Sequence, residues 1–412
     1  MTLARLLGSA VAPPVLDTNE ESALATLDEV IAEVVAPLAP EHDDEGRYPT
    51  RAVEALKGCG ILGLAVPEEF GGIGASHTAS LHAQVRLAVA DSSVAQVYKV
   101  HDELVREIFS YCSDDLKPRL ASLVLEENAM LGLAVAEAGR TVADPFTTVA
   151  LEQEDGSHVI NGQKIYTTGS AEADYVAVWG VNPERFTPEN PFFALQLNLV
   201  AKDTPGMTVH RDWDTLGQRA TDSGSISFEN VHVGPEWNAS IPGRAPLPHS
   251  GVRFEAGFAA VNVGIGIGAL QAAVPFVNEH SRPWPSAEVD NAADDPMVQR
   301  TTGELVADLA AAHELTMRCG QLIDAFERGE VSRTDLAIPI YAARSAADRA
   351  GLAAAQGIYG LMGTRSVRRP LGFDQWWRNV RTLSLHDPVE WKHAEIGKHV
   401  LTGWDPPPGI YT

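Results

Sequence analysis

The spacing of apolar residues predicts helices at both ends of the chain. From Glu21 to Leu38, apolar side chains recur every three or four residues, which is the period of a helix with one buried face. The same spacing predicts helices over 51–57, 77–90, 94–110 and 116–125. Gly58 and Gly60 end the first of these. From Gly251 the helical pattern returns and continues to about residue 400.

The middle of the chain has a different period. Asp155-Gly156 and Asn161-Gly162 are dipeptides typical of β-hairpin turns. Alternating apolar residues predict a strand over 193–199 and a pair of strands over 226–233. The chain therefore reads as a mainly α fold with a central β domain. We place the domains at 18–130, 131–245 and 246–412.

The segment from 254 to 277 is apolar nearly all round, as expected for a helix buried in a bundle. Its "GIGIGA" at 264–269 matches the dinucleotide-binding fingerprint, which requires a strand before it and a helix after it. Because both flanks are helical, we interpret these glycines as small residues that allow close helix packing. The apolar surface of this helix and of its Ala-rich neighbours predicts a homotetramer with packed bundles.

Charge and cysteine content exclude several classes of protein. The 412 residues carry a net charge of −24, which argues against a nucleic-acid partner. The sequence contains no uninterrupted apolar run of about 18 residues, so it does not predict a membrane span. Cys59, Cys112 and Cys319 lie far apart and lack metal or redox spacing, as is typical of a cytoplasmic protein.

One short segment near the end carries candidate chemistry. "WWRNVRTLSLHDPVEWK" (376–392) contains three tryptophans together with His386 and Asp387. An imidazole that titrates near neutral pH, beside a carboxylate, suits acid–base catalysis, although spacing alone allows a structural role equally well. His101 is a second candidate, for which spacing favours the structural role. The histidines lack the H-E-x-x-H metal spacing, and no G-x-S-x-G nucleophile elbow occurs.

Three segments resemble the acyl-CoA dehydrogenase superfamily. They are "LGLAVPEEFGGIG" (62–74), "VINGQKIYTTGSAEADYVAVWG" (159–180) and "LGQRATDSGSISFENVHV" (216–233). The resemblance implies an N-terminal helical domain, a middle β barrel and a C-terminal four-helix bundle. It also implies a flavin between barrel and bundle, usually in a homotetramer.

Other segments resemble the flavin-dependent monooxygenase branch of this superfamily. They are "WDTLGQRATDSGS" (213–225), "RPWP" (282–285) and "GFDQWWRNVRTLSLHDPVEWK" (372–392). The resemblance implies an enzyme that takes reduced FMN from a separate flavin reductase and, with O₂, oxygenates a sulfur- or nitrogen-containing small molecule. An FAD-dependent acyl-CoA dehydrogenase-like oxidoreductase is the alternative, but the "E-G-T" motif with its catalytic Glu is missing. A third reading is a non-catalytic scaffold that has lost the flavin.

The resemblance assigns roles to individual residues. It implies that His386 holds or protonates the activated oxygen over the flavin and that Asp387 orients His386. It places Thr168 at the edge of the isoalloxazine ring and Trp213 beside the ring.

Further positions concern the cofactor phosphate and a departure from the relatives. Arg282 is expected to meet the flavin phosphate, across a subunit boundary, and Gly363 and Arg369 are assigned to the same cofactor site. The relatives carry an Asn at the position of Leu133. An apolar side chain cannot donate a hydrogen bond, so the identity of the donor in this chain stays open.

Overall fold

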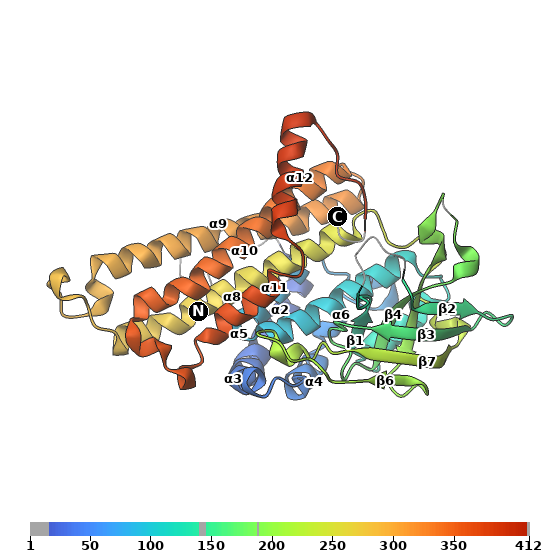
Figure 1. Ribbon diagram of the computed structural model, residues 1–412, viewed down its shortest axis with the longest axis horizontal. Coiled ribbons are helices and arrows are strands. Elements are labelled where there is room, and N and C mark those ends of the chain that lie inside the picture. Colours follow the sequence, from blue (N-terminus) through green and yellow to red (C-terminus); the bar gives the residue numbers. More distant parts are fainter. Residues whose placement is uncertain (1–15, 140–145, 188, 410–412) are drawn as a thin grey trace.

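The computed structural model describes residues 16–139, 146–187 and 189–409. A bundle of long helices forms one end of the molecule, a curled sheet forms the other, and shorter helices lie between them (Figure 1). Helices change to strands between 125 and 131, and strands change back to helices between 233 and 250. This is the expected order of helices, strands and helices.

The N-terminal part consists of helices. They are α2 (Thr18–Val30), α3 (Ala36–Glu45), α4 (Thr50–Gly58), α5 (His77–Ala90), α6 (Ser92–Tyr111) and α7 (Leu116–Leu125), with a π-helical turn, Ile31–Val35, joining α2 and α3. The helices predicted over 77–90 and 116–125 are confirmed as α5 and α7. Side chains that accept hydrogen bonds from the first turn cap the N-termini of two of these helices. Asp17 and Glu20 form a capping box at α2, and Asp91 accepts the first free N–H groups of α6.

The middle part is one curled seven-stranded sheet, in the position expected for the β domain. Its strands are β1 (Leu131–Ala134), β2 (Val149–Glu152), β3 (His158–Lys164), β4 (Tyr175–Val181), β5 (Leu195–Ala201), β6 (Met207–Val209) and β7 (Ile226–Val233). The strand order is β1-β4-β2-β3-β7-β6, and β5 pairs with β4. The predicted turn at Asp155-Gly156 is confirmed, because it lies between the antiparallel strands β2 and β3.

Two predictions for the sheet were wrong, and both concern one β-bulge between β3 and β7, which was misread as a break in a strand. Asn161-Gly162 lies inside β3, where the register with β7 shifts between Ile160 and Gly162. Residues 226–233 form one strand rather than a pair, and Asn230 within it has a left-handed backbone (φ +52°). A bulge inserts one residue and shifts the apolar alternation by one position, which is the pattern that suggested a break.

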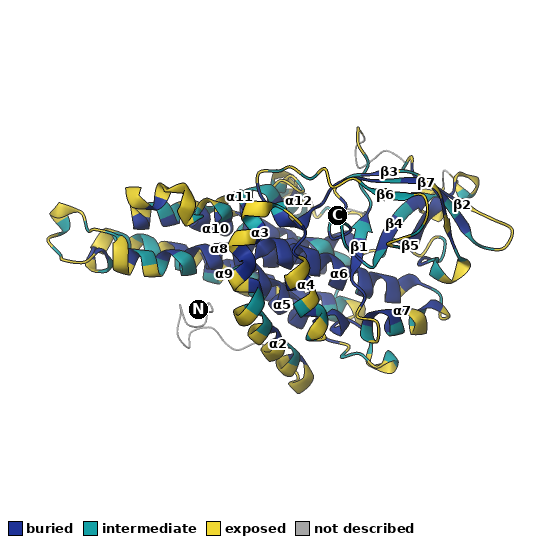
Figure 2. Ribbon diagram, turned by 90° about the horizontal axis from the view of Figure 1, so that it is seen from below, coloured by how far each residue is buried: buried dark blue, intermediate teal, exposed yellow. Residues whose placement is uncertain are grey.

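The C-terminal part contains α8 (Ser250–His280), α9 (Pro296–Glu327), α10 (Arg333–Met362), α11 (Asp374–Leu383) and α12 (Val389–Thr402). Helix α8 packs against α9, α10 and α11, and also against α5 and α6 of the N-terminal part. It is long and apolar enough to cross a membrane, but it is mostly buried as the central helix of the bundle. Figure 2 shows that burial is greatest around α8, α5 and α6 and decreases toward the distal ends of α9 and α10.

The glycines of "GIGIGA" lie within α8 and allow close packing, as predicted. A Cβ at Gly264 would lie 2.5 Å from Cβ of Ala88, and one at Gly268 would lie 2.5 Å from the Trp376 ring. A Cβ at Gly266 would lie 3.0 Å from Cα of Gly351 in α10. The interpretation of these residues as packing glycines is therefore confirmed.

The loop between β6 and β7 connects the sheet to the bundle. The backbone N–H of Gln218 donates to Oδ1 of Asn379 in α11 (2.6 Å), and Arg378 donates to the carbonyl of Leu216 (3.1 Å). Arg378 also forms an ion pair with Asp43 of α3. The contact leaves no room for a side chain at Gly217, where a Cβ would lie 2.1 Å from the carbonyl oxygen of Arg378.

This close approach predicts that Gly217→Ala destabilises the protein. Overpacking against backbone that cannot move aside costs about 1–3 kcal/mol. The matched control is Gly397→Ala in α12, where an added Cβ meets no atom within 4 Å and helix propensity favours Ala by up to about 1 kcal/mol. Denaturant unfolding of both variants checks this. Equal stabilities for the two variants would contradict it.

Candidate active site

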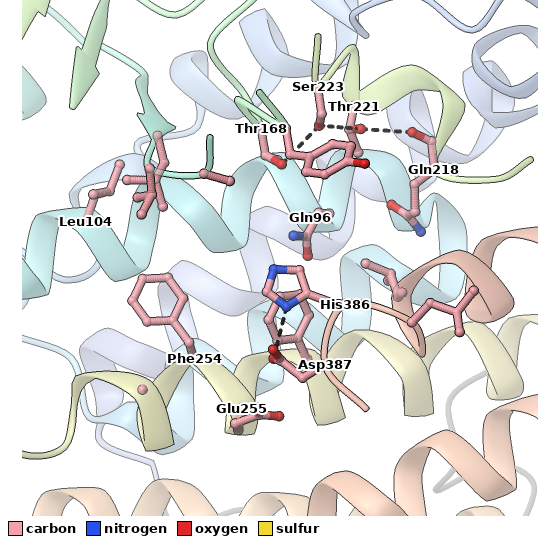
Figure 3. A pocket seen from close by; sticks show the side chains of 18 of the residues that line it. Gln96, Leu104, Thr168, Gln218, Thr221, Ser223, Phe254, Glu255, His386 and Asp387 are labelled. Atoms are coloured by element: carbon pink, nitrogen blue, oxygen red, sulfur yellow. Dashed lines mark hydrogen bonds and ion pairs between the residues drawn. The ribbon is translucent and has the colours of Figure 1, made fainter. Parts of the chain in front are cut away.

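A cavity of about 640 Å³ lies where the sheet, α6, the start of α8 and the turn after α11 meet. Figure 3 shows this cavity from close by. The volume is within the range of small-molecule sites. Most of the lining is apolar, with aromatic walls contributed by Tyr111, Phe146, Tyr166, Trp179, Trp213, Phe254 and Phe258.

One side of the cavity is a row of hydroxyl groups from the sheet domain, formed by Thr168, Thr221 and Ser223. The Ser223 hydroxyl is 2.9 Å from that of Thr168 and 2.8 Å from that of Thr221 (Figure 3). The Thr221 hydroxyl donates to the carbonyl of Gln218, which also accepts from the indole N–H of Trp213 at 2.9 Å. This hydroxyl row is therefore fixed by its own hydrogen bonds and by the loop that contacts α11.

An aromatic pair lies beside the hydroxyl row. The rings of Tyr166 and Trp213 meet edge to face, with centroids 5.9 Å apart. Tyr166 has a left-handed backbone (φ +55°), which is uncommon for a residue with a large side chain. Its side chain is 64% exposed although it lines the cavity. The pair therefore presents aromatic surface to a ligand at the edge of the cavity.

The opposite side carries the His386–Asp387 pair, in the turn between α11 and α12. Nδ1 of His386 is 3.0 Å from Oδ2 of Asp387, and the imidazole packs on the Phe258 ring with centroids 4.3 Å apart. Burial opposes the charge of Asp387, but hydrogen bonds with His386 and Glu255 hold its pKa below the ordinary value.

The ionised carboxylate of Asp387 sets the tautomer of His386. A carboxylate can only accept hydrogen bonds, so Nδ1 of the imidazole must be the donor. Nε2 is then the nitrogen that exchanges a proton with a ligand. In Figure 3 the ring extends from the Asp387 side toward the hydroxyl row and Gln96. The pair therefore has the geometry of a positioned acid–base group.

A buried set of charges supports this turn. Glu255 of α8 is 2% exposed and pairs with Arg344 Nε (3.0 Å) and Lys392 Nζ (3.2 Å). Burial raises the pKa of Glu255, against the opposing effect of the two cations. Although Glu255 lines the cavity, both of its oxygens are engaged, so it is not a free base.

The structure brings together four of the site residues expected from the sequence. Thr168, Trp213, His386 and Asp387 all line the cavity. Leu133 lines it as well, so the apolar substitution noticed in the sequence faces the candidate site.

His101 lies outside the cavity. It is fully buried, its Nε2 is 3.0 Å from the carbonyl of Leu62, and its Nδ1 accepts the backbone N–H of Leu131 at 3.1 Å. Burial lowers its pKa to about 4. Nδ1 therefore connects α6 to the start of β1, and Nε2 connects α6 to the turn Ile61–Gly63, which favours the structural role.

Arg282, Gly363 and Arg369 also lie away from His386. Arg282 and Gly363 line a second cavity of about 830 Å³ at the opposite end of α8. About 33 Å of helix separates Phe258 from His280, at about 1.5 Å per residue. Arg369 is exposed in the short turn Arg369–Leu371. Within one chain, none of these residues reaches the His386 cavity.

Gln96 and Gln218 line the cavity but were not singled out in the sequence. Gln218 lies within the quoted segment 216–233, so the motif itself contained a signal. Gln96 lies on α6, which is buried over most of its length and carries several other polar residues. No pattern in the sequence separates Gln96 from these residues.

Comparison with known proteins agrees with this architecture. The N-terminal, middle and C-terminal domains of acyl-CoA dehydrogenase match residues 17–127, 132–231 and 256–391. A dibenzothiophene monooxygenase of Rhodococcus qingshengii is 32% identical over 92% of this chain and 93% of its own length. The probable FMNH2-dependent monooxygenase SfnC of Pseudomonas putida is 30% identical over 96% of this chain and 99% of its own length.

The crystal structure of FMN-bound TdsC from Paenibacillus sp. A11-2 superimposes with a TM-score of 0.89 at 30% identity, covering 95% of this chain and 100% of TdsC. All three relatives are therefore similar to this chain along nearly its whole length. The chain belongs to the acyl-CoA dehydrogenase family.

Proposed function

We propose that the protein is the oxygenase of a two-component flavin-dependent monooxygenase. It uses reduced FMN and O₂ to oxygenate a sulfur- or nitrogen-containing small molecule. The observation that carries this proposal is the His386–Asp387 pair, which faces a hydroxyl row across a mostly apolar cavity. The similarity to dibenzothiophene monooxygenase, to SfnC and to FMN-bound TdsC supports the same reaction class.

The cavity residues fit an isoalloxazine ring. The ring is flat and apolar on its faces and has hydrogen-bonding groups along its edge, and the cavity combines aromatic walls with the hydroxyl row. Thr168 and Ser223 would hold the polar edge, and Tyr166 and Trp213 would lie beside the ring. Reduced FMN supplies the two electrons that divide O₂ between substrate and water, so that FMNH₂, O₂ and substrate give FMN, oxygenated substrate and water.

The remaining chemistry belongs to the chain itself. His386, held by Asp387, exchanges a proton with the reacting oxygen through Nε2. The aromatic walls exclude water, so that the activated oxygen reaches the substrate rather than being lost as hydrogen peroxide. The FAD-dependent dehydrogenase reading is less supported. The two buried glutamates of the cavity cannot act freely as a base, because Glu255 is engaged by Arg344 and Lys392 and Glu107 is engaged by Arg253.

Assembly is the second part of the proposal. The second cavity brings together Arg282, expected at the flavin phosphate, and Gly363, expected at the cofactor site, at a distance from the His386 cavity that only another copy of the chain can bridge. Trp284 and Met297 beside it are 73% and 60% exposed. We therefore place the phosphate end of FMN against Arg282 of a neighbouring chain in a homotetramer.

The partners and the location follow from the reaction. A separate flavin reductase supplies reduced FMN through transient contact. The three cysteines Cys59, Cys112 and Cys319 are unpaired thiols, which supports a cytoplasmic enzyme.

The first prediction concerns the source of electrons. The pure chain should bind FMN more tightly than FAD, because Arg282 is expected to meet the phosphate and no dinucleotide-binding loop occurs among the described residues. It should not oxidise NADH, because the fingerprint-like glycines of α8 serve helix packing. Product should form only when reduced FMN is supplied, by a reductase or by photoreduction. Fluorescence titration with both flavins and NADH absorbance measure this. NADH oxidation by the chain alone would contradict it.

The second prediction concerns His386. His386→Ala should lower the product formed per FMNH₂ oxidised by about 10²–10⁴-fold, the usual contribution of an acid–base group. The half-exposed position of this side chain means that stability and FMN affinity should change little. Asp387→Asn should reduce the ratio less, because an amide still positions the imidazole. Dibenzothiophene is the probe substrate. A wild-type ratio in His386→Ala would make this histidine structural.

The third prediction separates the phosphate contact from assembly. Arg282→Ala should weaken FMN by about ten- to a hundredfold, as expected for one lost charged hydrogen bond, and should leave the tetramer intact. Trp284→Glu should dissociate the tetramer and weaken FMN together, although the chain's own His386 cavity is unchanged. Light scattering and FMN titration measure both variants. A monomeric wild-type protein at micromolar concentration would disprove the shared site.

A further inference from the structure

The side chain of Gln96 faces the cavity without a hydrogen-bond partner. Gln96 is 6% exposed and lines the cavity from α6. Its amide oxygen is buried without a partner, and the carboxamide makes no hydrogen bond to any other described residue. Figure 3 shows the amide between the hydroxyl row of Thr168 and Ser223 and the ring of His386.

The polar groups nearest to Gln96 bond to one another rather than to its carboxamide. Thr168, Ser223 and Thr221 bond to one another, and His386 bonds to Asp387. Ser92 lies one helical turn before Gln96, and its hydroxyl accepts from the amide of Gln218 at 2.9 Å. A buried amide left without partners is costly for a folded protein. Its retention at the centre of the cavity indicates that a ligand, rather than the protein, supplies the partner.

The reaction itself calls for a hydrogen-bond donor in this part of the cavity. When one oxygen atom leaves for the substrate, negative charge develops on the oxygen that stays behind, and a preorganised N–H donor stabilises such charge. Leu133 lines the same cavity and cannot donate a hydrogen bond. His386 has one nitrogen engaged with Asp387 and only Nε2 available. Gln96 can supply an uncharged N–H donor beside Nε2 of His386.

We propose that the carboxamide of Gln96 donates a hydrogen bond to the oxygen bound at the cofactor, beside Nε2 of His386. This inference rests on the proposed function. A carboxamide does not titrate, so its donor is present at every pH at which the protein is folded. His386 and Gln96 then divide two tasks, because His386 moves the proton and Gln96 holds the oxygen in place.

The experiment uses three variants of the full chain. Gln96→Leu removes the amide at similar volume, and Gln96→Glu keeps the shape but offers no N–H₂ group. The matched control is Gln84→Leu in α5. Gln84 is also fully buried with both amide atoms unpartnered, but it does not line the cavity. Each variant is measured by thermal unfolding without flavin, by titration with oxidised FMN, and by mixing photoreduced FMN–protein with O₂ in the absence of substrate.

We expect Gln96→Leu and Gln84→Leu to be at least as stable as the wild type, because each removes an unsatisfied amide. Oxidised FMN should bind all proteins within about threefold of the wild-type affinity, because the oxygen to which Gln96 is proposed to donate is absent from oxidised FMN. Gln96→Leu and Gln96→Glu should return to oxidised FMN, with release of hydrogen peroxide, about tenfold or more faster than the wild type. Gln84→Leu should behave as the wild type.

The outcomes separate this inference from the proposed function. If the wild type re-oxidises its FMN as fast as free FMN does, the proposed function fails and the role of Gln96 fails with it. If the wild type protects reduced FMN and Gln96→Leu protects it equally, only the role of Gln96 is overturned. A marked loss of stability in Gln96→Leu, without one in Gln84→Leu, would make the amide structural and would also overturn the inference.

Discussion

The guanidinium of Arg344 is the group on which the geometry of the candidate active site depends. It is 1% exposed, and it donates to Glu255 of α8 at 3.0 Å and to the carbonyl of Leu383, the last residue of α11, at 3.2 Å. It also pairs with Asp348 of its own helix. Arg344 therefore connects three helices immediately before the turn that carries His386. A planar cation with five donors suits this position, where a lysine would satisfy fewer acceptors.

The sheet domain contains a second buried pair with a comparable role. Nζ of Lys164 is 2.8 Å from Oε1 of Glu137, and both side chains are almost fully buried. Burial opposes the charge of both groups. The hydrogen bond from Lys164 nevertheless lowers the pKa of Glu137 to about 2, while the pKa of Lys164 falls to about 8. Glu137 also accepts the backbone N–H groups of Thr147 and Thr148, which fixes the chain just before β2. Glu137 is therefore engaged in holding the backbone of the sheet domain, and it does not act as a catalytic base.

The sequence predicts an element of this structure well where the pattern that encodes the element is local. Helices α5 and α7 could be placed to the residue, because their apolar period and their ends are local features. The bulge between β3 and β7, near Gly162 and Asn230, could not be predicted, because a shift in alternation looks the same whether the chain turns back or continues. His386 could be singled out as a candidate because aromatic and acidic neighbours surround it in one short segment, but its role came from the family resemblance and not from that pattern.

Gln96, in contrast, could not be recognised as a cavity residue from the sequence. Lys99, Asp102, Glu103 and Glu107 on the same helix are also buried polar residues, so polarity alone does not mark a position on α6. Only the contact between α6, the sheet and the turn after α11 decides that Gln96 faces the cavity while Lys99 lies behind Phe258, 3.9 Å from its ring centroid. That contact is made by residues distant in sequence, and no periodicity encodes it.

The same reasoning explains how one fold can support different flavin chemistry. Removing a proton from carbon requires a carboxylate that is free to act as a base. The carboxylates lining this cavity are all engaged: Glu107 with Ser250 and Arg253, Glu255 with Arg344 and Lys392, and Asp387 with His386. The cavity also offers an imidazole nitrogen of His386 and the carboxamide of Gln96. Groups that offer N–H donors and a titratable nitrogen, within aromatic walls, suit an oxygen atom that must be held, protonated and kept from water. In this chain, therefore, the electrostatic neighbours of each carboxylate determine the reaction that the cavity can support, and the fold determines where that cavity lies.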